Sequence, residues 1–380
     1  MRKWWGRALA AVCCLCLLTG PAGAEDVQER IDALCDQYDA IGLSAAYVSG
    51  GQVRAVYASG WATVNDAPMT ADTKVRIASV TKVLVGLAAH LTAEAGYIDL
   101  DAPIDDAIGF YLARRSQADV ISPRSILTHT SSLKTALGPS GVYDAVHETL
   151  SDPDSFYPAV SGSLRNWDYN NYAFYVLGLA IEHASGQTLD QILNAGLLNA
   201  LEADGSFWAG DLKRPELTAT VYTQEHGIGL SFEEQVAVHS KGPAANGAVF
   251  AGNYHISARD LGKIAATLAA DGVYAGERVL PTSVVEALEE IRFDRPVPDS
   301  RFYQAQPLRY QENMLGREAL YYHTGSSYGE LCFFSYDPAR GDGVVVLSTG
   351  AERLNYHGIY GVCGEIAELL YALCPEEETP

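Results

Sequence analysis

The stretch RIASVTKVLVGLAAHLTAEAG, residues 76–96, joins a Ser-x-x-Lys element to an apolar helical pattern. Apolar residues at positions 80, 83, 84, 87, 88 and 91 predict a buried helix that ends near Gly96. Three residues make almost one helical turn, so Ser79 and Lys82 are expected on the same face. A serine hydroxyl becomes a nucleophile when a neighbour accepts its proton, and burial lowers the pKa of a lysine enough to allow this. The helix N-terminus adds backbone N–H groups where an oxyanion would develop.

A second Ser-x-x-Lys element shows that this motif alone is a weak signal. Residues 131–134, Ser-Ser-Leu-Lys, have the same spacing. A helix cannot continue from there through Gly138-Pro139, because proline lacks a backbone donor and clashes with the preceding turn. The same-face argument therefore holds for Ser79 and not for the second copy, which we interpret as coincidence.

Two further elements supply groups that an acyl-transfer site needs. Residues 169–171, Tyr-Asn-Asn, are the only Tyr-x-Asn in the chain and precede an apolar helical pattern. The tyrosine can relay a proton between the serine and a leaving group, and Asn171 can bond an amide carbonyl. A polar loop with a helix-capping asparagine is the alternative. Residues 323–325, His-Thr-Gly, end a β-rich run with a partial positive charge, a hydroxyl and a glycine that lets a substrate backbone come close.

The remaining periodicity indicates one sheet built from both ends of the chain. Helical patterns cover residues 27–40, 172–184, 189–198, 258–270 and 360–372, and Ser257 is a plausible N-cap. Beta-rich runs cover residues 43–48, 52–59, 61–64, 319–324, 330–336 and 343–348, with turns expected at 49–51, at Gly325 and at 337–341. Strands at both ends of a helical middle predict an α+β fold rather than alternating βαβ units. We expect an α/β part at about residues 25–80 and 250–380, and a helical part at about 81–249.

The first 24 residues have the layout of a secretory signal peptide. A basic start at Arg2, Lys3 and Arg7 precedes the apolar run 8–18 and a small-residue tail that ends at Ala24. The apolar run is too short to span a bilayer comfortably, although an uncleaved membrane anchor is the alternative. We therefore expect a secreted or extracytoplasmic protein, in a periplasm or at the cell exterior, with no stable membrane insertion after cleavage.

The charge balance and the missing motifs exclude several classes of partner. The chain has 26 Lys and Arg against 47 Asp and Glu, a formal charge of −21. Nucleic acids and anionic membranes bind basic faces, so neither is expected as a partner. The acidic residues between Asp99 and Asp106 lack the glycine and the closing glutamate of an EF-hand, and no zinc-ligand spacing or phosphate-binding glycine motif occurs. We expect neither a metal nor a cofactor, and the sequence does not indicate the oligomeric state.

In this order and spacing, the motifs resemble the serine β-lactamase and penicillin-binding-protein superfamily. They are most similar to the branch that holds class C β-lactamases, one type of D-alanyl-D-alanine carboxypeptidase and related esterases. The resemblance covers residues 40–372 and rests on the segments 76–103, 126–133, 169–186 and 323–347. In the second of these, Ile-Leu-Thr-His-Thr-Ser-Ser-Leu, Ser132 replaces the glycine of the family pattern.

The resemblance implies a role for each matching residue. Ser79 would be acylated, and Lys82 with Tyr169 would manage its proton. The backbone N–H groups of Ser79 and Ser326 would form the oxyanion hole, and Asn171 would help to hold the acyl side chain. The implied substrate-binding set is Asn171, His323, Thr324, Gly325 and Ser326.

The resemblance also implies a fold and gives one disulfide its geometry. The superfamily has an antiparallel sheet flanked by the N- and C-terminal helices and an all-helical subdomain, with the site between them. Without residues 1–24, four cysteines remain, namely Cys35, Cys332, Cys363 and Cys374, and they permit three connectivities. Neighbouring terminal helices would favour a Cys35–Cys374 disulfide, and four unpaired buried thiols are the alternative.

His323 departs from the pattern of most of the superfamily, which has lysine there to attract a substrate carboxylate. Histidine occurs at this place in carboxypeptidase-like and aminopeptidase-like members of the branch. A solvated histidine has a pKa of about 6.5, so we expect a partial charge at neutral pH and weaker carboxylate binding above about pH 7 than lysine would give.

The sequence therefore favours an exported serine hydrolase that works through an acyl-enzyme on Ser79. The leading hypothesis is a D-alanyl-D-alanine carboxypeptidase-like peptidase that binds β-lactams and acts on cell-wall peptides. An esterase or amidase with a small substrate, and a β-lactamase, remain alternatives. A catalytically idle relative that binds cell-wall peptides or a partner protein is a third, although it would not need Ser79, Lys82, Tyr169 and Asn171 together.

Overall fold

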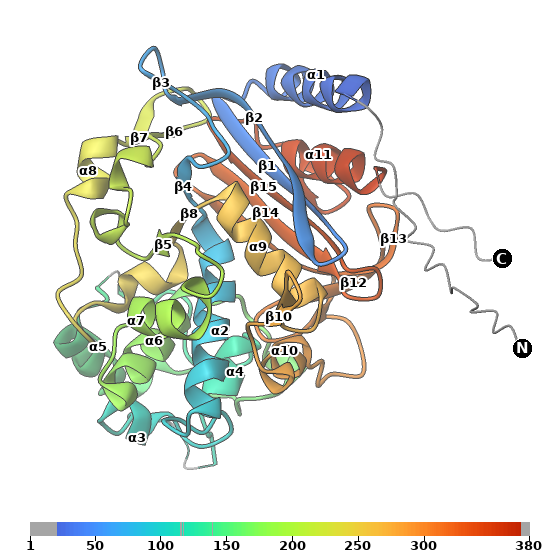
Figure 1. The fold of residues 1–380 in the computed structure, drawn as a ribbon. Helices are drawn as coiled ribbons and strands as arrows, with labels where there is room; N and C mark the ends of the chain where they lie inside the picture. The colour runs from blue at the N-terminus through green and yellow to red at the C-terminus, as the bar shows by residue number, and fades with distance from the viewer. Residues whose placement is uncertain (1–20, 115, 117, 139, 374–380) are drawn as a thin grey trace, which may run out of the picture.

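The computed structural model describes residues 21–114, 116, 118–138 and 140–373 (Figure 1). Most of the predicted signal peptide lies outside these residues, and so does Cys374. Among the described residues, no helix has both the length and the apolar character needed to cross a membrane.

The centre of the fold is an eight-stranded antiparallel sheet built from both ends of the chain (Figure 1). Its strand order is β11-β12-β13-β14-β15-β1-β2-β3. The strands are β1 (Gly42–Ser49), β2 (Gln52–Thr63), β3 (Ala67–Pro68), β11 (Tyr303–Gln304), β12 (Arg309–Met314), β13 (Arg317–Ser327), β14 (Glu330–Asp337) and β15 (Asp342–Thr349). Because β1 pairs with both β2 and β15, the first strands of the chain join the last ones directly, as the sequence predicts.

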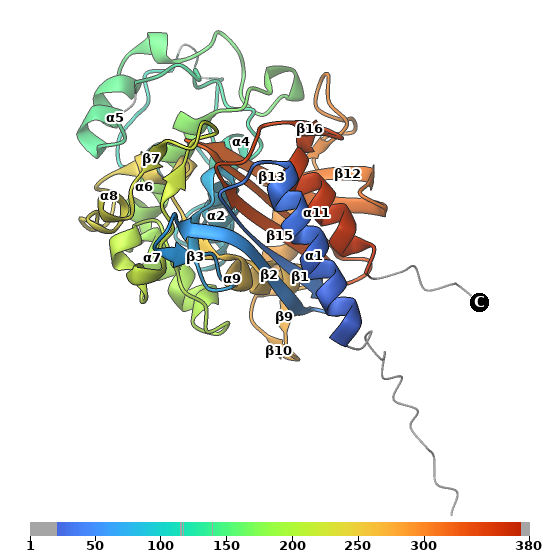
Figure 2. The ribbon, with the colours of Figure 1, turned by 90° about the horizontal axis from the view of Figure 1, so that it is seen from above.

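Helices cover both faces of this sheet, so its central strands are buried along their length. The terminal helices α1 (Pro21–Gln37) and α11 (Gly361–Tyr371) lie side by side on one face (Figures 1 and 2). Successive side chains of a strand point to opposite faces. Ala45 and Val346 accordingly lie in the same core cluster as the terminal helices, whereas Ala46 and Val345 lie in the other cluster, which includes α9 (Ala258–Ala269) and α2 (Thr81–Glu94).

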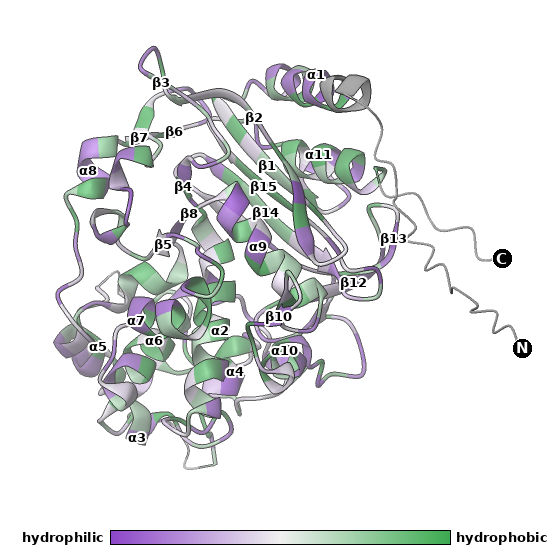
Figure 3. Cartoon of the chain, in the orientation of Figure 1, coloured by the Kyte–Doolittle hydropathy of each residue, from purple (hydrophilic) through white to green (hydrophobic). Residues whose placement is uncertain are grey.

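The helical part beside the sheet is organised around α2. This helix is apolar and buried on almost every side (Figure 3), which is typical of a central helix rather than an amphipathic surface helix. The other helices outside the sheet's own cover are α3 (Asp105–Ile108), α4 (Pro123–Leu127), α5 (Tyr143–Leu150), α6 (Asn171–Ser185), α7 (Leu189–Leu193), which continues as a π-helical turn (Asn194–Leu198), α8 (Phe232–Val236) and α10 (Thr282–Glu289). Of these, α6, α7 and α10 pack against α2. The 3₁₀ turns are η1 (Ala78–Val80), η2 (Pro153–Ser155), η3 (Leu164–Asn166), η5 (Ala209–Asp211), η6 (Pro215–Leu217) and η7 (Gly247–Ala251).

Short strands complete the chain and join its two parts. A three-stranded sheet contains β4 (Lys74–Arg76), β8 (His255–Ser257) and β5 (Gly205–Ser206). Three hairpins are formed by β6 (Val221–Tyr222) with β7 (Ile228–Leu230), β9 (Val273–Tyr274) with β10 (Glu277–Arg278), and β16 (Asn355–Tyr356) with β17 (Ile359–Tyr360). The predicted division of the chain at about residues 80 and 250 stays a prediction.

Two predictions of local structure are confirmed. Ser257 caps α9, since its hydroxyl accepts a hydrogen bond from the Asp260 N–H at 3.1 Å. Residues 131–134 are not helical, so the second Ser-x-x-Lys element does not place its serine and lysine on one helical face.

Two others are wrong. The run from Trp61 is the end of β2 rather than a separate strand, because the same strand pairs first with β1 and then with β3. Gly325 is not a turn residue, since β13 continues to pair with β14 as far as Ser327. The turn lies at Tyr328 and Gly329, whose φ values are 49° and 135°.

Candidate active site

Ser79 lies in a tight turn between β4 and the central helix. Ala78 has a φ of 46°, a left-handed conformation that costs a residue with a side chain about 1–2 kcal/mol. Ala78 and Val80 are fully buried, whereas Ser79 between them is partly exposed. The turn therefore presents one hydroxyl to the surface at the start of a buried helix.

Lys82 is fully buried one turn later, and its side-chain nitrogen contacts Ser79. Nζ lies 3.3 Å from Ser79 Oγ, 2.8 Å from Asn171 Oδ1 and 2.7 Å from the backbone oxygen of Ala251. The sequence-predicted pair of serine and lysine is thus within hydrogen-bond distance, and Asn171 joins it from the start of α6.

The surroundings of Lys82 favour a neutral amine. Burial lowers its pKa, the phenol of Tyr169 opposes this effect, and the charges of Arg309 and Arg76 lower the pKa further. A neutral amine has two N–H groups and one lone pair. The oxygens of Asn171 and Ala251 can take the two N–H groups, which leaves the lone pair for the hydroxyl of Ser79. In that state Lys82 can accept the serine proton.

Tyr169 approaches the same amine from the loop before α6. Lys82 Nζ lies 5.0 Å from the centre of the Tyr169 ring, and the ring centres of Tyr169 and His323 are 6.5 Å apart. Tyr169 is therefore next to both the lysine and β13. A phenol in this place can pass a proton to a leaving group.

Gly325 lets β13 pack directly on the turn that carries Ser79. A Cβ atom at this position would lie 2.4 Å from the backbone oxygen of Ile77 and 3.2 Å from the backbone nitrogen of Ser79. The next residue, Ser326, lines a pocket together with Ser79. The elements that carry both predicted oxyanion donors, the N–H groups of Ser79 and Ser326, are thus in contact.

The edge of β13 beside Ser79 is open. The strand β12 starts at Arg309, which pairs with Tyr322. Within the part of the chain that the structure describes, no strand pairs with residues 323–327 on that side. An extended substrate backbone can add to such an edge as a further strand.

The prediction of a partly charged His323 is wrong. The imidazole is only 1% exposed, and its Nδ1 lies 2.7 Å from the backbone oxygen of Thr324. Burial, followed by the charges of Arg309 and Lys82, lowers the pKa of His323 well below 6.5. His323 is therefore neutral at neutral pH. The prediction failed because the sequence reveals the residue type at position 323 but not its burial.

Arg309 supplies the fixed charge that the sequence analysis missed. Its Nη1 lies 3.5 Å from Thr324 Oγ1, and its guanidinium carbon lies 4.6 Å from the ring centre of Phe302 and 6.0 Å from that of Tyr169. Arginine remains protonated at any pH at which proteins fold. No motif surrounds Arg309, and only the pairing of β12 with β13 brings it to the site.

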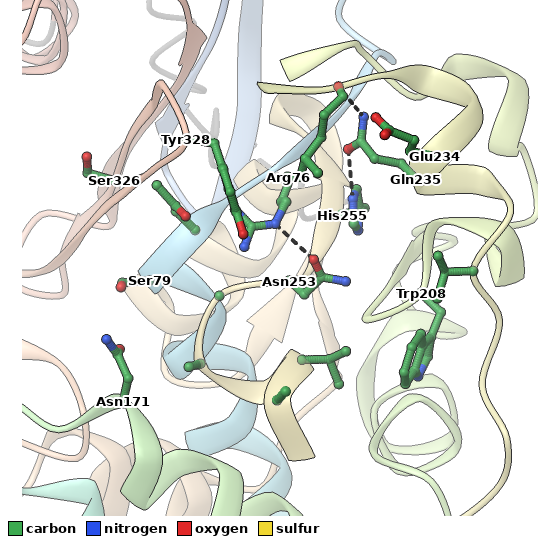
Figure 4. A pocket seen from close by; sticks show the side chains of 18 of the residues that line it. Arg76, Ser79, Asn171, Trp208, Glu234, Gln235, Asn253, His255, Ser326 and Tyr328 are labelled. Atoms are coloured by element: carbon green, nitrogen blue, oxygen red, sulfur yellow. Dashed lines mark hydrogen bonds between the residues drawn. The ribbon is translucent and has the colours of Figure 1, made fainter. Parts of the chain in front are cut away.

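A pocket of about 550 Å³ opens on the other side of Ser79 (Figure 4). Ser79, Ser326 and Asn171 lie at one end, and Trp208 and Glu234 lie across the cavity from them. Asn171 Oδ1 accepts from Lys82, and the amide N–H groups of Asn171 remain available to donate to a carbonyl of a bound acyl group.

A buried ion pair forms part of the pocket wall. Arg76 Nη1 lies 3.0 Å from Glu330 Oε1, its Nε donates to Asn253 Oδ1 at 2.9 Å, and its guanidinium lies 5.1 Å from the ring centre of Tyr328. Burial raises the pKa of Glu330 to about 7, although Arg76 opposes this shift. Arg76 in the pocket wall is therefore held by Asn253, Glu330 and Tyr328 without a ligand.

Other sequence predictions have different outcomes. Cys35, Cys332 and Cys363 are buried, and none of them is bonded to another cysteine among the described residues. Because Cys374 lies outside those residues, the Cys35–Cys374 disulfide stays a prediction. In the described ranges, no three His, Cys, Asp or Glu side chains gather as metal ligands.

Comparisons with known proteins place this arrangement in a family. Residues 27–358 match the sequence model of the family described as Beta-lactamase. A segment of 198 residues is 31% identical to Esterase EstB of Burkholderia gladioli, and it covers 45% of this chain and 49% of that enzyme. The match thus spans about half the length of that relative.

Solved structures share the fold at low identity. The Beta-Lactamase/D-Alanine Carboxypeptidase of Pseudomonas syringae is 16% identical, with a TM-score of 0.73 over 94% of this chain and 100% of that one. The D-amino acid amidase of Ochrobactrum anthropi SV3 is 22% identical, with a TM-score of 0.68 over 92% of this chain and 97% of that one. The sheet, the terminal helices and the helical part are therefore the β-lactamase/transpeptidase-like fold.

Replacing Gly325 with alanine should displace the turn that carries Ser79. We expect Gly325→Ala to slow covalent labelling by a fluorophosphonate about 100-fold, since a shift of about 1 Å at a reacting group has an effect of that order. Labelling is followed by mass spectrometry. Gly138→Ala is the matched control, because a Cβ there meets no atom within 4 Å. Equal labelling rates in the two variants would contradict the close packing of β13 on this turn.

His323 should not titrate near neutral pH. We expect the labelling rates of the wild type and of His323→Gln to keep a constant ratio from about pH 5.5 to 8, because a neutral side chain is exchanged for a neutral one. Stopped-flow labelling across this range measures the ratio. A ratio that changes near pH 6.5 would mean that His323 gains a proton there.

Proposed function

Because the chain belongs to the β-lactamase family of hydrolases, we propose that it forms an acyl-enzyme on Ser79 and acts on peptides that end in a D-amino-acid carboxylate. The proposed activity is that of a D-alanyl-D-alanine carboxypeptidase-like enzyme. The observation that carries the proposal is the buried Lys82 Nζ, 3.3 Å from Ser79 Oγ, because it gives the serine a base.

The proposed acylation step uses groups that are already adjacent. Ser79 Oγ attacks the substrate carbonyl while its proton moves to the lone pair of Lys82. The carbonyl oxygen gains negative charge and accepts hydrogen bonds from the N–H groups of Ser79 and Ser326. Tyr169 then carries the proton to the leaving amine, and the bond between carbonyl carbon and nitrogen breaks. Water hydrolyses the resulting ester of Ser79.

The two sides of Ser79 suit the two halves of such a peptide. The pocket in front of Asn171 would receive the acyl portion. The leaving D-amino acid would lie along the open edge of β13, with its carboxylate directed to Thr324 and Arg309. A carboxylate that accepts from a charged guanidinium gains about 1.5–3 kcal/mol.

An esterase is the second candidate, supported by the 31% identity to Esterase EstB. An ester substrate would use Ser79 and Lys82 in the same way but would have no need of the charge on Arg309. A β-lactamase would need rapid hydrolysis of the acyl-enzyme as well. A binding protein without activity would leave the base beside Ser79 unused.

We also propose that the protein acts outside the cytoplasm on small-molecule or cell-wall peptide substrates. The support is the signal-peptide layout of residues 1–24. The acidic charge of the chain supports the absence of nucleic acid among its partners.

Covalent labelling tests the proposed nucleophile and separates the candidates. A fluorescent penicillin and a fluorophosphonate are incubated with the wild type and with Ser79→Ala, and adducts are identified by mass. We expect both probes to label only the wild type, with a penicillin adduct that lasts for hours. Labelling by the fluorophosphonate alone would favour the esterase, and rapid loss of the penicillin adduct the β-lactamase. Adducts that persist in Ser79→Ala would remove Ser79 from its role.

Arg309 tests the carboxylate side of the proposal. We expect Arg309→Gln to lower kcat/KM for an acyl-D-alanyl-D-alanine peptide about 10- to 100-fold, the loss of one charged hydrogen bond. The same peptide with a C-terminal amide should change little, and Arg309→Lys should retain most of the activity because it keeps the charge. Steady-state kinetics on both peptides measures this. An equal loss on the two peptides would contradict carboxylate binding by Arg309.

A further inference from the structure

Tyr169 belongs to no helix or strand that would fix its ring. It lies in the irregular residues 167–170, between η3 and the first residue of α6. A proton relay needs its hydroxyl held near one position, because small displacements of a reacting group strongly reduce the rate. The contacts that hold this loop must therefore come from elsewhere in the chain.

His129 contacts three consecutive residues of this loop. Its backbone oxygen accepts from the N–H of Asp168 at 2.9 Å, and its ring Nδ1 accepts from the N–H of Asn170 at 3.2 Å. Between these two bonds, its ring packs against the ring of Tyr169, with centres 4.4 Å apart and planes inclined by 34°. One residue thus holds the backbone on both sides of Tyr169 and also contacts its side chain.

The remaining contacts keep His129 itself in place. It is 2% exposed, and its ring lies 5.3 Å from that of Phe174 and 6.2 Å from that of Trp167. The backbone oxygen of Leu133, four residues after His129, accepts from Asn170 Nδ2 at 2.8 Å. The segment that carries His129 therefore makes a third hydrogen bond to the loop. His129 does not line the pocket that contains Ser79, so any effect on the reaction acts through Tyr169.

The bond to Asn170 also determines where the imidazole carries its proton. A backbone N–H is always a donor, so Nδ1 must be the unprotonated nitrogen and Nε2 must carry the hydrogen. Protonation of both nitrogens would replace an acceptor by a donor that faces another donor. Burial, the largest cause, lowers the pKa of His129 well below 6.5, and the positive charge of Arg309 acts in the same direction, so the ring stays neutral.

We propose that His129 is a positioning residue that holds Tyr169 in place for proton transfer, through the backbone bonds on either side of it. This inference rests on the role of Tyr169 in the proposed function. The imidazole of His129 has a specific role, because the backbone N–H of Asn170 needs an acceptor at the position of Nδ1, which an apolar ring would not provide.

Two substitutions, which place an amide group at the position of one or the other ring nitrogen, separate this role from simple core packing. In His129→Asn the amide oxygen takes the place of Nδ1, and asparagine tolerates the φ of 56° found here. In His129→Gln the amide group lies one bond further out, at the place of Nε2. His90→Leu is the matched control for the loss of a buried neutral histidine, since His90 is 3% exposed and burial lowers its pKa to about 4.

Hydrolysis of an acyl-D-alanyl-D-alanine peptide and of a p-nitrophenyl ester provides the readout. With the peptide, we expect His129→Gln to lower kcat about 10- to 100-fold with KM nearly unchanged, and His129→Asn to stay within about threefold of the wild type. With the ester the loss should be much smaller, because p-nitrophenolate leaves without a proton. On a Tyr169→Phe background His129→Gln should cause no further loss, and His90→Leu should leave kcat unchanged. Equal losses in His129→Asn and His129→Gln, or a loss that adds fully to that of Tyr169→Phe, would overturn the inference.

A spectroscopic measurement tests the inference independently of the substrate. In ¹⁵N-histidine-labelled protein, long-range ¹H–¹⁵N spectra should show His129 protonated on Nε2 alone from about pH 5 to 8. A proton on Nδ1 would overturn the proposal whatever the enzyme hydrolyses. Failure of the proposed function is recognised separately, since it would appear as labelling that survives in Ser79→Ala or as a Tyr169→Phe variant with full peptidase activity. The second of these results would remove the role of His129 as well.

Discussion

Lys82 Nζ lies 3.3 Å from Ser79 Oγ at a place from which water is excluded, and much of the surrounding structure keeps it there. A lysine on a surface helix would be a solvated cation that donates to the serine and takes nothing from it. Burial of α2 on almost every side removes that solvation, and Asn171 and Ala251 replace it with two acceptors. The central position of α2 is therefore a chemical requirement as well as a packing result.

The architecture follows from this constraint. A helix that is buried all round needs neighbours on every side, and here they include α6, α7, α10 and the turn η7. The sheet closes the site because β13 can approach the Ser79 turn at Gly325, where a side chain would meet the oxygen of Ile77. The strand β13, which carries this edge, comes late in the chain and is joined to β1 through β14 and β15. Both ends of the chain thus define the position of one hydroxyl.

Local pattern was sufficient to predict most of the helices and strands and the position of Ser79 at the start of a buried helix. The apolar period after Ser79, the Ser257 cap and the β-rich runs at both ends depend on neighbours in sequence, and the structure has them where they were expected. The burial of a single side chain and the register between strands depend on residues that are distant in sequence. The sequence analysis was wrong about His323 and missed Arg309 for this reason. His323 was expected to be partly charged because its solvation cannot be derived from its neighbours, and Arg309 went unnoticed because only the register of β12 against β13 brings it to the site.

Three basic side chains share the small region around Tyr169, and burial, followed by repulsion among them, determines which of them is charged. Arg309 lowers the pKa of both Lys82 and His323, and Lys82 also lowers the pKa of His323. Arginine does not lose its proton, so the pKa values of the other two side chains, Lys82 and His323, are lowered instead. These two are also the more deeply buried. The result is a neutral amine beside the serine, a neutral imidazole on β13 and a single fixed charge on β12. A lysine at position 323 would place a second amine in this region and would compete with Arg309 for the same role. Under the proposed function, the histidine fits a site in which Arg309 on the neighbouring strand supplies the charge for a substrate carboxylate, while Lys82 keeps its lone pair for Ser79.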